Sequence, residues 1–468
     1  MILIGLLLRA DMLGIDVRFH PDEALFAAQA RLISHGGDLL LRETDLDKPP
    51  LTFYVTALSF VTLSPSEFAA RLPNVLASGA SLAVLYALGW SLYRRRAVAL
   101  VAALLWSLSP FDLAFAATAF TDVQATLWTL VAALLAARDR WGWAGIAVAL
   151  VAASKPTALL FLPLIAALGV ARHASLDWRP RDVLRRLERF AAPLAVGLAL
   201  LILWDAARAP RSFWELGLER NNPGRLIRAE EVWPRLEAWL RWLDAATGSR
   251  ALNLALMAGA ALGAAGGALR GRDRRTVVDW LIGGFGVAFV GWYWLVAFNT
   301  YDRYLHTLFP FALLLAARVL VMVWDRLGGR PVAGAALVAL VVAAMLPGVA
   351  GVLRGQAPTG GDQGRHTGID ALAEAINDEL RGEIVYDHWL GWELAYYLGA
   401  KPAALVLYTP LPEALAEDMA GQPYPRYFVA PSPDHAAPWI AALDRSAVAA
   451  AIVYHDPAHG FVVYRLEQ

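Results

Sequence analysis

The sequence contains no cysteine and few charged residues. Without cysteine the chain forms no disulfide, has no thiol nucleophile and offers no thiolate to a metal. The lack of cysteine does not indicate whether the protein works in an oxidising or a reducing compartment. Charged residues make up 18% of its 468 residues, where a soluble domain carries about a quarter. The 41 basic and 41 acidic residues cancel, so nothing indicates nucleic-acid binding. The shortage of charge instead suggests a largely apolar environment.

Hydrophobic residues are abundant, at 58% of the chain. They come in blocks, and most blocks approach the roughly 20 residues that cross a bilayer. The stretch Met1 to Leu8 is too short to cross alone or to be a signal peptide, so we interpret it as the tail of a first span. The sequence therefore predicts an α-helical polytopic membrane protein with about 11 transmembrane helices. The other spans are expected at 67–92, 97–117, 120–137, 141–154, 157–171, 190–207, 250–269, 277–298, 304–323 and 332–350.

Arginine is unevenly distributed among the loops. Short loops almost free of basic residues alternate with arginine-bearing loops at 94–96, 138–140, 172–189, 270–275 and 326–330. The positive-inside rule places the arginines in the cytoplasm, and we predict a multi-pass protein of the cell (inner) membrane. The segments then expected on the extracytoplasmic side are 9–66, the turns near 110–120 and 153–156, the loop 208–249, the turn 299–303 and the carboxyl terminus.

The composition changes past Arg354. Residues 351–367 are polar and glycine-rich, which indicates a linker between a transmembrane domain at 1–350 and an extracytoplasmic α/β domain at 368–468. In that last domain, strands are expected in GEIVYDH, RYFVAP, AAAIVYHD and GFVVYRL, and helices in HWLGWELAYYLG and PEALAEDMA. Gly259, Gly263 and Gly267 are spaced by four residues on one span, which indicates close helix packing.

Ionisable residues gather where the predicted spans meet the outer face. Charge at the edge of a bilayer is costly and needs a reason. Each residue alone also fits a snorkelling side chain or a helix cap, as Asp122 after Thr121 does. Convergence of independent segments on one face favours a functional site, with the first outer loop 9–66 carrying much of it. The candidates are Asp22, Glu23, Asp45, Asp47, Lys48, Asp122, Lys155, Tyr301, Asp302, Arg303 and His306.

These residue types suit group transfer from a phosphate. A carboxylate in a partly dry pocket can accept a proton from an acceptor hydroxyl or amine. Lysine and arginine can hold a leaving phosphate and stabilise the charge that it gains. Displacement at an anomeric carbon needs a base on one face and a stabilised leaving group on the other, by analogy with inverting glycoside hydrolysis.

Several motifs in this order resemble a known family. An early Asp22-Glu23 pair, DKPPL, ARLPNVL, the TD at Asp122, SKP and DRYLHTLFPFALLLAA are similar to the GT-C fold glycosyltransferases, as is FWELGLERNNPGR. Within that fold the chain most resembles glycosyltransferase family 39, the protein O-mannosyltransferase and aminoarabinose transferase group. The resemblance covers roughly residues 1–325 and implies transfer of a sugar from a polyprenyl-phosphate donor to a protein, lipid or glycan.

The resemblance also implies roles for individual residues. Asp22 corresponds to the catalytic carboxylate with Glu23 in support, and Asp122 to a second acid of the same cavity. Lys48, Arg303 and Lys155 are expected to bind the donor phosphate, and His20, Asp47, Tyr301 and His306 are additional candidates. The sequence departs from aminoarabinose transferases at Leu25-Phe26, at Pro156 and at Asp302, where those proteins often have Arg-Tyr, Gly and Pro.

A required metal is not predicted. Asp45-Leu46-Asp47 has the form of a DxD triplet and His20 lies near Asp22 in the sequence, and carboxylates with histidine can hold a divalent ion. Such triplets arise easily by chance, and we expect no required cofactor.

Two other classes of protein remain as alternatives. A polytopic transporter or lipid flippase would explain many spans, but it predicts repeats and helices broken near mid-membrane, and no repeat is visible in the sequence. A non-catalytic scaffold of the cell envelope is the third interpretation, and the presence of Asp22, Lys48 and Asp122 argues against it.

Overall fold

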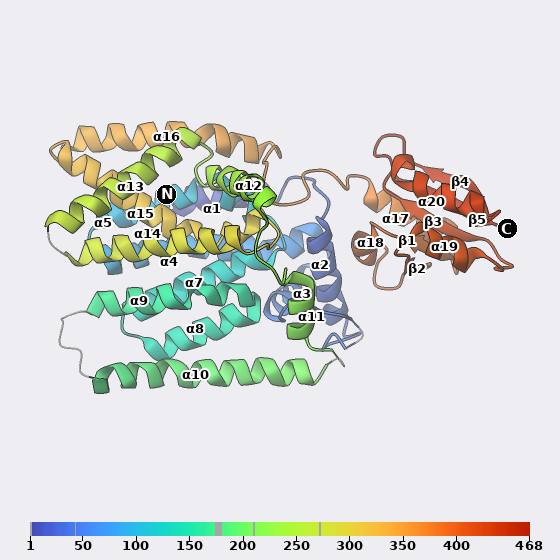
Figure 1. Ribbon diagram of the computed structural model, residues 1–468, viewed down its shortest axis with the longest axis horizontal. Coiled ribbons are helices and arrows are strands. Elements are labelled where there is room, and N and C mark those ends of the chain that lie inside the picture. Colours follow the sequence, from blue (N-terminus) through green and yellow to red (C-terminus); the bar gives the residue numbers. More distant parts are fainter. Residues whose placement is uncertain (1, 43, 174–179, 209–210, 271–272) are drawn as a thin grey trace. The chain divides into compact units, whose positions relative to one another are not determined.

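The computed structural model describes residues 2–468 except 43, 174–179, 209–210 and 271–272 (Figure 1). The chain divides into two compact units, and each takes parts from distant places in the sequence. The first unit comprises Met1–Ile15 and Gly36–Gly360, and the second comprises Asp16–His35 and Gly361–Gln468. Residues 16–35, expected in an outer loop of the transmembrane domain, thus fold with the carboxyl-terminal domain.

The first unit is made of helices. Its α-helices are α1 (Ile2–Met12), α3 (Leu51–Leu63), α4 (Glu67–Tyr93), α5 (Arg96–Ser107), α6 (Pro110–Ala116), α7 (Thr121–Ala137), α8 (Trp141–Ser154), α9 (Leu162–His173), α10 (Pro180–Ala206), α11 (Phe213–Asn221), α12 (Val232–Asp244), α13 (Arg250–Arg270), α14 (Arg274–Leu295), α15 (Phe309–Arg326) and α16 (Pro331–Leu353). Short 3-10 helices are η1 (Pro156–Phe161), η2 (Ala229–Glu231) and η3 (Asp302–Leu305).

Four helices in the described part of the chain are long and apolar enough to cross a membrane: α4, α10, α14 and α16. Helices α5 and α6 meet at a bend of 57°, and they count as a fifth candidate if the bent pair forms one span. Pro110 begins α6, where its missing N–H costs little and its ring prevents α5 from continuing. Five shorter apolar helices accompany them, so the full number of about 11 spans stays a prediction.

The first outer loop contains more helix than expected. Residues Pro21–Ser34 form α2, in which Phe26 and Ile33 are buried. Leu51–Leu63 form α3, whose apolar run begins directly after Pro49-Pro50 and is shorter than the roughly 20 residues of a span.

The second unit contains a five-stranded mixed sheet in its described residues, in the order β2-β1-β3-β5-β4. β1 (Ile384–Asp387) pairs in parallel with β2 (Leu405–Tyr408) and β3 (Arg426–Ala430), whereas β5 (Val462–Glu467) is antiparallel to β3 and β4 (Ala449–His455). Strand β2, at an edge, was missed because it is short and half exposed. The strands at β1, β3, β4 and β5 lie where the sequence predicted them.

Helices pack around this sheet over two hydrophobic clusters, one centred on Phe428 and Trp439 and the other on Val385 and Leu372. The helices are α17 (Ile369–Glu379), α18 (Gly391–Tyr397), α19 (Pro412–Met419) and α20 (Pro433–Arg445). Helices α18 and α19 were expected, whereas α17 and α20 were not.

Helix α2 joins this second unit through α18. Phe19 meets Tyr396 edge-on at 4.8 Å between ring centroids, and Arg31 donates a hydrogen bond of 2.9 Å to the carbonyl of Ala395. These non-local contacts explain why the segment leaves the unit that its sequence neighbours belong to.

Candidate functional site

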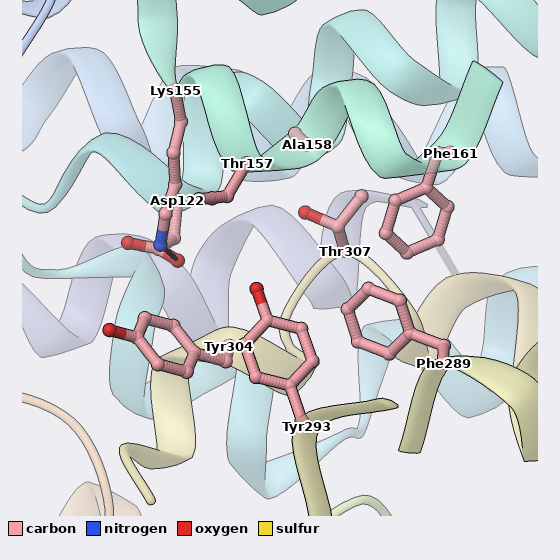
Figure 2. Close-up of a pocket in the computed structure, with 9 residues that line it drawn as sticks. All are labelled: Asp122, Lys155, Thr157, Ala158, Phe161, Phe289, Tyr293, Tyr304 and Thr307. Atoms are coloured by element: carbon pink, nitrogen blue, oxygen red, sulfur yellow. Dashed lines mark hydrogen bonds and ion pairs between the residues drawn. The ribbon is translucent and has the colours of Figure 1, made fainter. Parts of the chain in front are cut away.

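Asp122 and Lys155 form an ion pair that is almost completely buried. Their side chains are 4% and 11% exposed, and Lys155 donates a hydrogen bond to Asp122 (Figure 2). Asp122 stands in the first turn of α7, where the helix dipole favours a negative charge. Lys155 follows the last turn of α8 in an extended conformation, because Pro156 prevents the helix from continuing. Phe120 holds the N-cap position of α7, so Asp122 is not the cap.

A small pocket opens beside this pair. Its volume is about 10 Å³, about the room of one water molecule. Tyr293 and Thr307 point into it, and Tyr304 also lines it, with the ammonium of Lys155 5.0 Å from the centre of the Tyr304 ring (Figure 2). The pocket therefore combines a buried charge pair with hydroxyl and aromatic groups, and it lies at the ends of α7 and α8.

Two more predicted cations act on the same lysine. Lys48 and Arg303 both lie close enough to Lys155 to interact with its charge. Lys48 donates to Asp47 at 2.6 Å, and the guanidinium of Arg303 covers the ring of Phe120 at 5.1 Å. The structure thus brings together all three residues that the sequence analysis assigned to the donor phosphate, each from a different segment of the first unit.

The segment that carries Arg303 is held in a tight turn. Asp302 accepts hydrogen bonds from the backbone N–H groups of Arg303, at 2.7 Å, and of Gly360, at 3.1 Å. Tyr301 is 44% exposed and packs against both Arg303 and Tyr304. Asp302, at a position where the resemblance showed a departure from proline, therefore orders this turn.

His306 lies inside the protein rather than at the pocket. It is 0% exposed, its Nδ1 lies 2.7 Å from the hydroxyl of Thr126, and its Nε2 lies 3.1 Å from Oδ1 of Asp112. Thr126 is one turn of α7 after Asp122, so the histidine supports the helix that carries this acid. Its role as an additional site residue stays a prediction.

Sequence reasoning missed the other members of this buried network. Arg9 and Asp112 are both 0% exposed and form an ion pair. Ser78 accepts from Arg9 at 2.6 Å and donates to Asp112 at 2.6 Å. Arg9 directly follows the short apolar stretch Met1 to Leu8, and Asp112 stands alone in an apolar run. An isolated acid in such a run needs a buried partner, which was the available signal.

Asp22, Glu23 and His20 belong to the second unit. His20 is the N-cap of α2: its Nδ1 accepts from the backbone N–H of Asp22 at 3.2 Å. Glu23 completes this capping box by accepting from the backbone N–H of His20 at 3.1 Å. Asp22 is therefore not the helix cap, and His20 and Glu23 together cap the start of α2. The catalytic assignments of Asp22 and Glu23 stay predictions.

The second unit holds a cluster of ionisable groups that the sequence analysis passed over. Nδ1 of His366 lies 2.5 Å from Asp362, and its Nε2 lies 3.0 Å from Oε1 of Glu393 without hydrogen-bond alignment. Burial raises the pKa of Glu393 to about 7, although the charge of His366 opposes this. His366 and Asp362 stand in the glycine-rich stretch that was predicted to be a linker. Because a linker is not expected to contribute to a buried cluster, the sequence analysis did not select them.

A metal site was not expected. Within the described ranges, no group of three or more histidine, aspartate or glutamate side chains is arranged to hold a metal ion. Asp47 of the DxD triplet is paired with Lys48 instead.

Comparison with known proteins gives one family match and several similar folds. Residues 47–180 match the family model described as dolichyl-phosphate-mannose-protein mannosyltransferase. No curated protein matches the chain significantly. The fold is similar to ArnT from Cupriavidus metallidurans in the apo state, with a TM-score of 0.68 and 17% identity over 99% of this chain and 96% of that one.

Two further structures share the fold. ArnT from the same organism bound to undecaprenyl phosphate has a TM-score of 0.67 and 15% identity, over 99% of this chain and 96% of that one. The apo oligosaccharyltransferase of Archaeoglobus fulgidus has a TM-score of 0.61 and 13% identity, over 98% of this chain and 73% of that one. The predicted resemblance to the GT-C glycosyltransferases is confirmed, and the chain has the fold of ArnT.

Proposed function

We propose that this chain is a membrane glycosyltransferase that takes a sugar from a polyprenyl-phosphate donor on the extracytoplasmic face. The observation that carries the proposal is the buried pair of Asp122 and Lys155 with Lys48 and Arg303 acting on the same lysine. Three cations gathered from separate segments form a binding place for a phosphate. The family model over residues 47–180 and the undecaprenyl phosphate bound to ArnT support the same class of donor.

The carboxylates next to the lysines prepare this phosphate site. A lysine ammonium has three N–H donors, and one carboxylate takes one of them. Asp122 and Asp47 therefore orient Lys155 and Lys48 while leaving donors for phosphate oxygens. Because the site is largely dry, these charge-assisted hydrogen bonds are stronger than they would be in water.

The reaction is a single displacement at the anomeric carbon. The bond from that carbon to the phosphate oxygen breaks, and its electron pair leaves with the polyprenyl phosphate. The acceptor oxygen or nitrogen forms the new bond from the opposite face, and its proton passes to a carboxylate. The cations stabilise the charge that develops on the phosphate, and the configuration at the anomeric carbon inverts.

We assign the proton-accepting carboxylate to Asp22. The His20–Glu23 capping box holds the start of α2, so the capping hydrogen bonds do not use the Asp22 side chain. Pro21 restricts the backbone just before it. The acceptor is a hydroxyl or amine of a protein, lipid or glycan, and the transferred sugar is a hexose or pentose.

The test uses the purified full chain reconstituted into liposomes with a panel of radiolabelled polyprenyl-phosphate sugars. We expect label to pass from at least one donor to an extracted acceptor fraction, and the double variant Asp122→Asn/Lys155→Met to lose this transfer while it stays folded. Lys401→Ala is the matched control, since Lys401 is exposed in the second unit. Movement of intact donor across the bilayer without transfer would identify a flippase and overturn the proposal.

A further inference from the structure

An open apolar cavity lies between α9 and α10, away from the charged pocket. Its volume is about 420 Å³, within the range of ligand sites. Ile165, Ala166 and Val170 of α9 form one wall, Leu187 and Phe190 of α10 form the other, and Trp141 of α8 also lines the cavity. It shares no lining residue with the pocket of Asp122 and Lys155.

The cavity follows from how its helices pack. Helix α10 lies along α8, and α9 lies along α7 (Figure 1). Glycine allows the close approach of α8 and α10, because a Cβ at Gly145 would stand 2.2 Å from the carbonyl of Phe190. Trp141 packs against Gly169 on one side and meets Phe190 edge-on at 6.3 Å on the other. The two walls are thus held apart by an indole ring between them.

The cavity is slightly shorter than one leaflet of a bilayer is thick. Its wall on α9 runs from Leu162 to Val170, which at 1.5 Å per residue is about 12 Å. One leaflet of a hydrocarbon core of about 30 Å is about 15 Å thick. The cavity is open on one side, since Leu187, which lines it, is 58% exposed. An acyl chain that stays within one leaflet matches this depth.

Arginines outnumber acids in the segments that precede Trp141 and contain Arg186. Arg186 lines the cavity, and its Nε lies 3.0 Å from Asp139, which also accepts from the indole of Trp141 at 2.7 Å. Residues 138–140 and 180–190 together contain six arginines and three acids. Arg140, Arg185 and Arg189 are exposed. Arg186 pairs with Asp139, and the two segments still hold three more arginines than acids. This excess of positive charge attracts an anionic group near Arg186.

We infer that the cavity binds an anionic phospholipid, with one acyl chain between α9 and α10 and the phosphate beside Arg186. Basic pockets between membrane helices are a known way of recognising anionic head groups. The apolar walls alone would accept a chain of any lipid, and the arginines supply the selectivity for charge. This site is separate from sugar transfer and does not depend on the proposed function.

The experiment measures lipid retention by native mass spectrometry of the purified full chain. Phosphatidylglycerol and phosphatidylcholine with identical acyl chains are titrated separately. We expect the wild type to prefer phosphatidylglycerol, Arg186→Gln to reduce that preference about fivefold, and Ala166→Trp to abolish retention of either lipid by filling the cavity. Matched controls are Arg330→Gln, an exposed arginine elsewhere, and Val196→Trp on an exposed face of α10.

Each outcome decides the inference. Equal retention of both lipids, or retention unchanged by Ala166→Trp, overturns it. Displacement of phosphatidylglycerol by polyprenyl phosphate also overturns it, because the cavity would then belong to the donor. If Ala166→Trp does not fold, Val170→Phe fills the same space with a smaller change and gives the same reading.

Discussion

Asp122 and Lys155 are 33 residues apart in the sequence and form a buried ion pair at the ends of two packed helices. The pair could serve stability or function, and the two roles respond differently to mutation. Lys155→Met leaves a buried carboxylate without its partner, which typically costs 3–5 kcal/mol, whereas replacing both charges is often close to neutral.

We therefore predict that Lys155→Met lowers the unfolding temperature and abolishes transfer. The double variant Asp122→Asn/Lys155→Met should recover most of the lost stability but none of the activity. Thermal unfolding and radiolabelled sugar transfer measure the two effects on the same samples. Recovered activity in the double variant would show that the pair is only structural.

Lys48→Ala is predicted to weaken donor use more than stability. A lost charge-assisted contact costs about 1.5–3 kcal/mol, which is about 10- to 150-fold in affinity. Pro49 and Pro50 stiffen the backbone after Lys48 and so restrict where its ammonium group can lie. Donor titration at a fixed acceptor concentration gives the affinity, and Lys401→Ala is the control. An unchanged donor affinity would show that Lys48 serves only as the partner of Asp47.

Asp22→Asn is predicted to fold normally and to lose transfer by about two orders of magnitude, the scale of a positioned acid–base group. Asparagine keeps the shape of the side chain but carries no charge and accepts no proton at neutral pH. Glu23→Gln preserves the capping box, since glutamine serves at this position too, and should reduce transfer less. Near-normal transfer by Asp22→Asn would show that Asp22 is not the proton-accepting carboxylate. Asp122 would then be the remaining candidate for that role.

Arg9→Met is predicted to destabilise the first unit strongly, by about 3–5 kcal/mol, because Asp112 would be buried without its partner. Arg9→Met combined with Asp112→Leu should recover part of the loss. Urea unfolding in detergent, followed by tryptophan fluorescence, measures both. Equal stability of wild type and Arg9→Met would mean that the network contributes little to the fold.

The Glu393–His366 cluster predicts a pH dependence of the second unit. Burial raises the pKa of Glu393 to about 7, from an ordinary value near 4.5. Burial alone would lower the pKa of His366, but Asp362 and Glu393 outweigh it and raise it. Both groups bind protons more tightly when folded, so their stabilisation is fully present at acid pH and is lost as the pH rises through about 7.

Hydrogen exchange of the amides in β1 and α18, corrected for the intrinsic effect of pH, measures this dependence between pH 5.5 and 8. Protection should fall as the pH rises, and Glu393→Gln should flatten the profile. A protection that increases with pH would show that the cluster is not the controlling group.

The sequence alone determined the class of this protein. Long apolar runs have few ways to satisfy their backbone except as membrane helices. Charges that stand where such runs end need a reason, and their convergence made Lys48, Lys155 and Arg303 candidates, whose role at a phosphate the family resemblance implied. Four strands of the second unit were visible because runs rich in valine, isoleucine and tyrosine are typical of strands, whereas β2 is too short to stand out.

Only the tertiary structure decided which groups meet. Asp122 could have been a helix cap, and the fold made it the partner of Lys155. Arg9 flanks an apolar segment, and the fold placed it in the core with Asp112. Residues 16–35 follow α1 in the sequence, yet the contacts of Phe19 and Arg31 with α18 place them in the second unit. Local composition sets what a segment can be, whereas ion pairs and packing between distant segments depend on the arrangement of the whole chain.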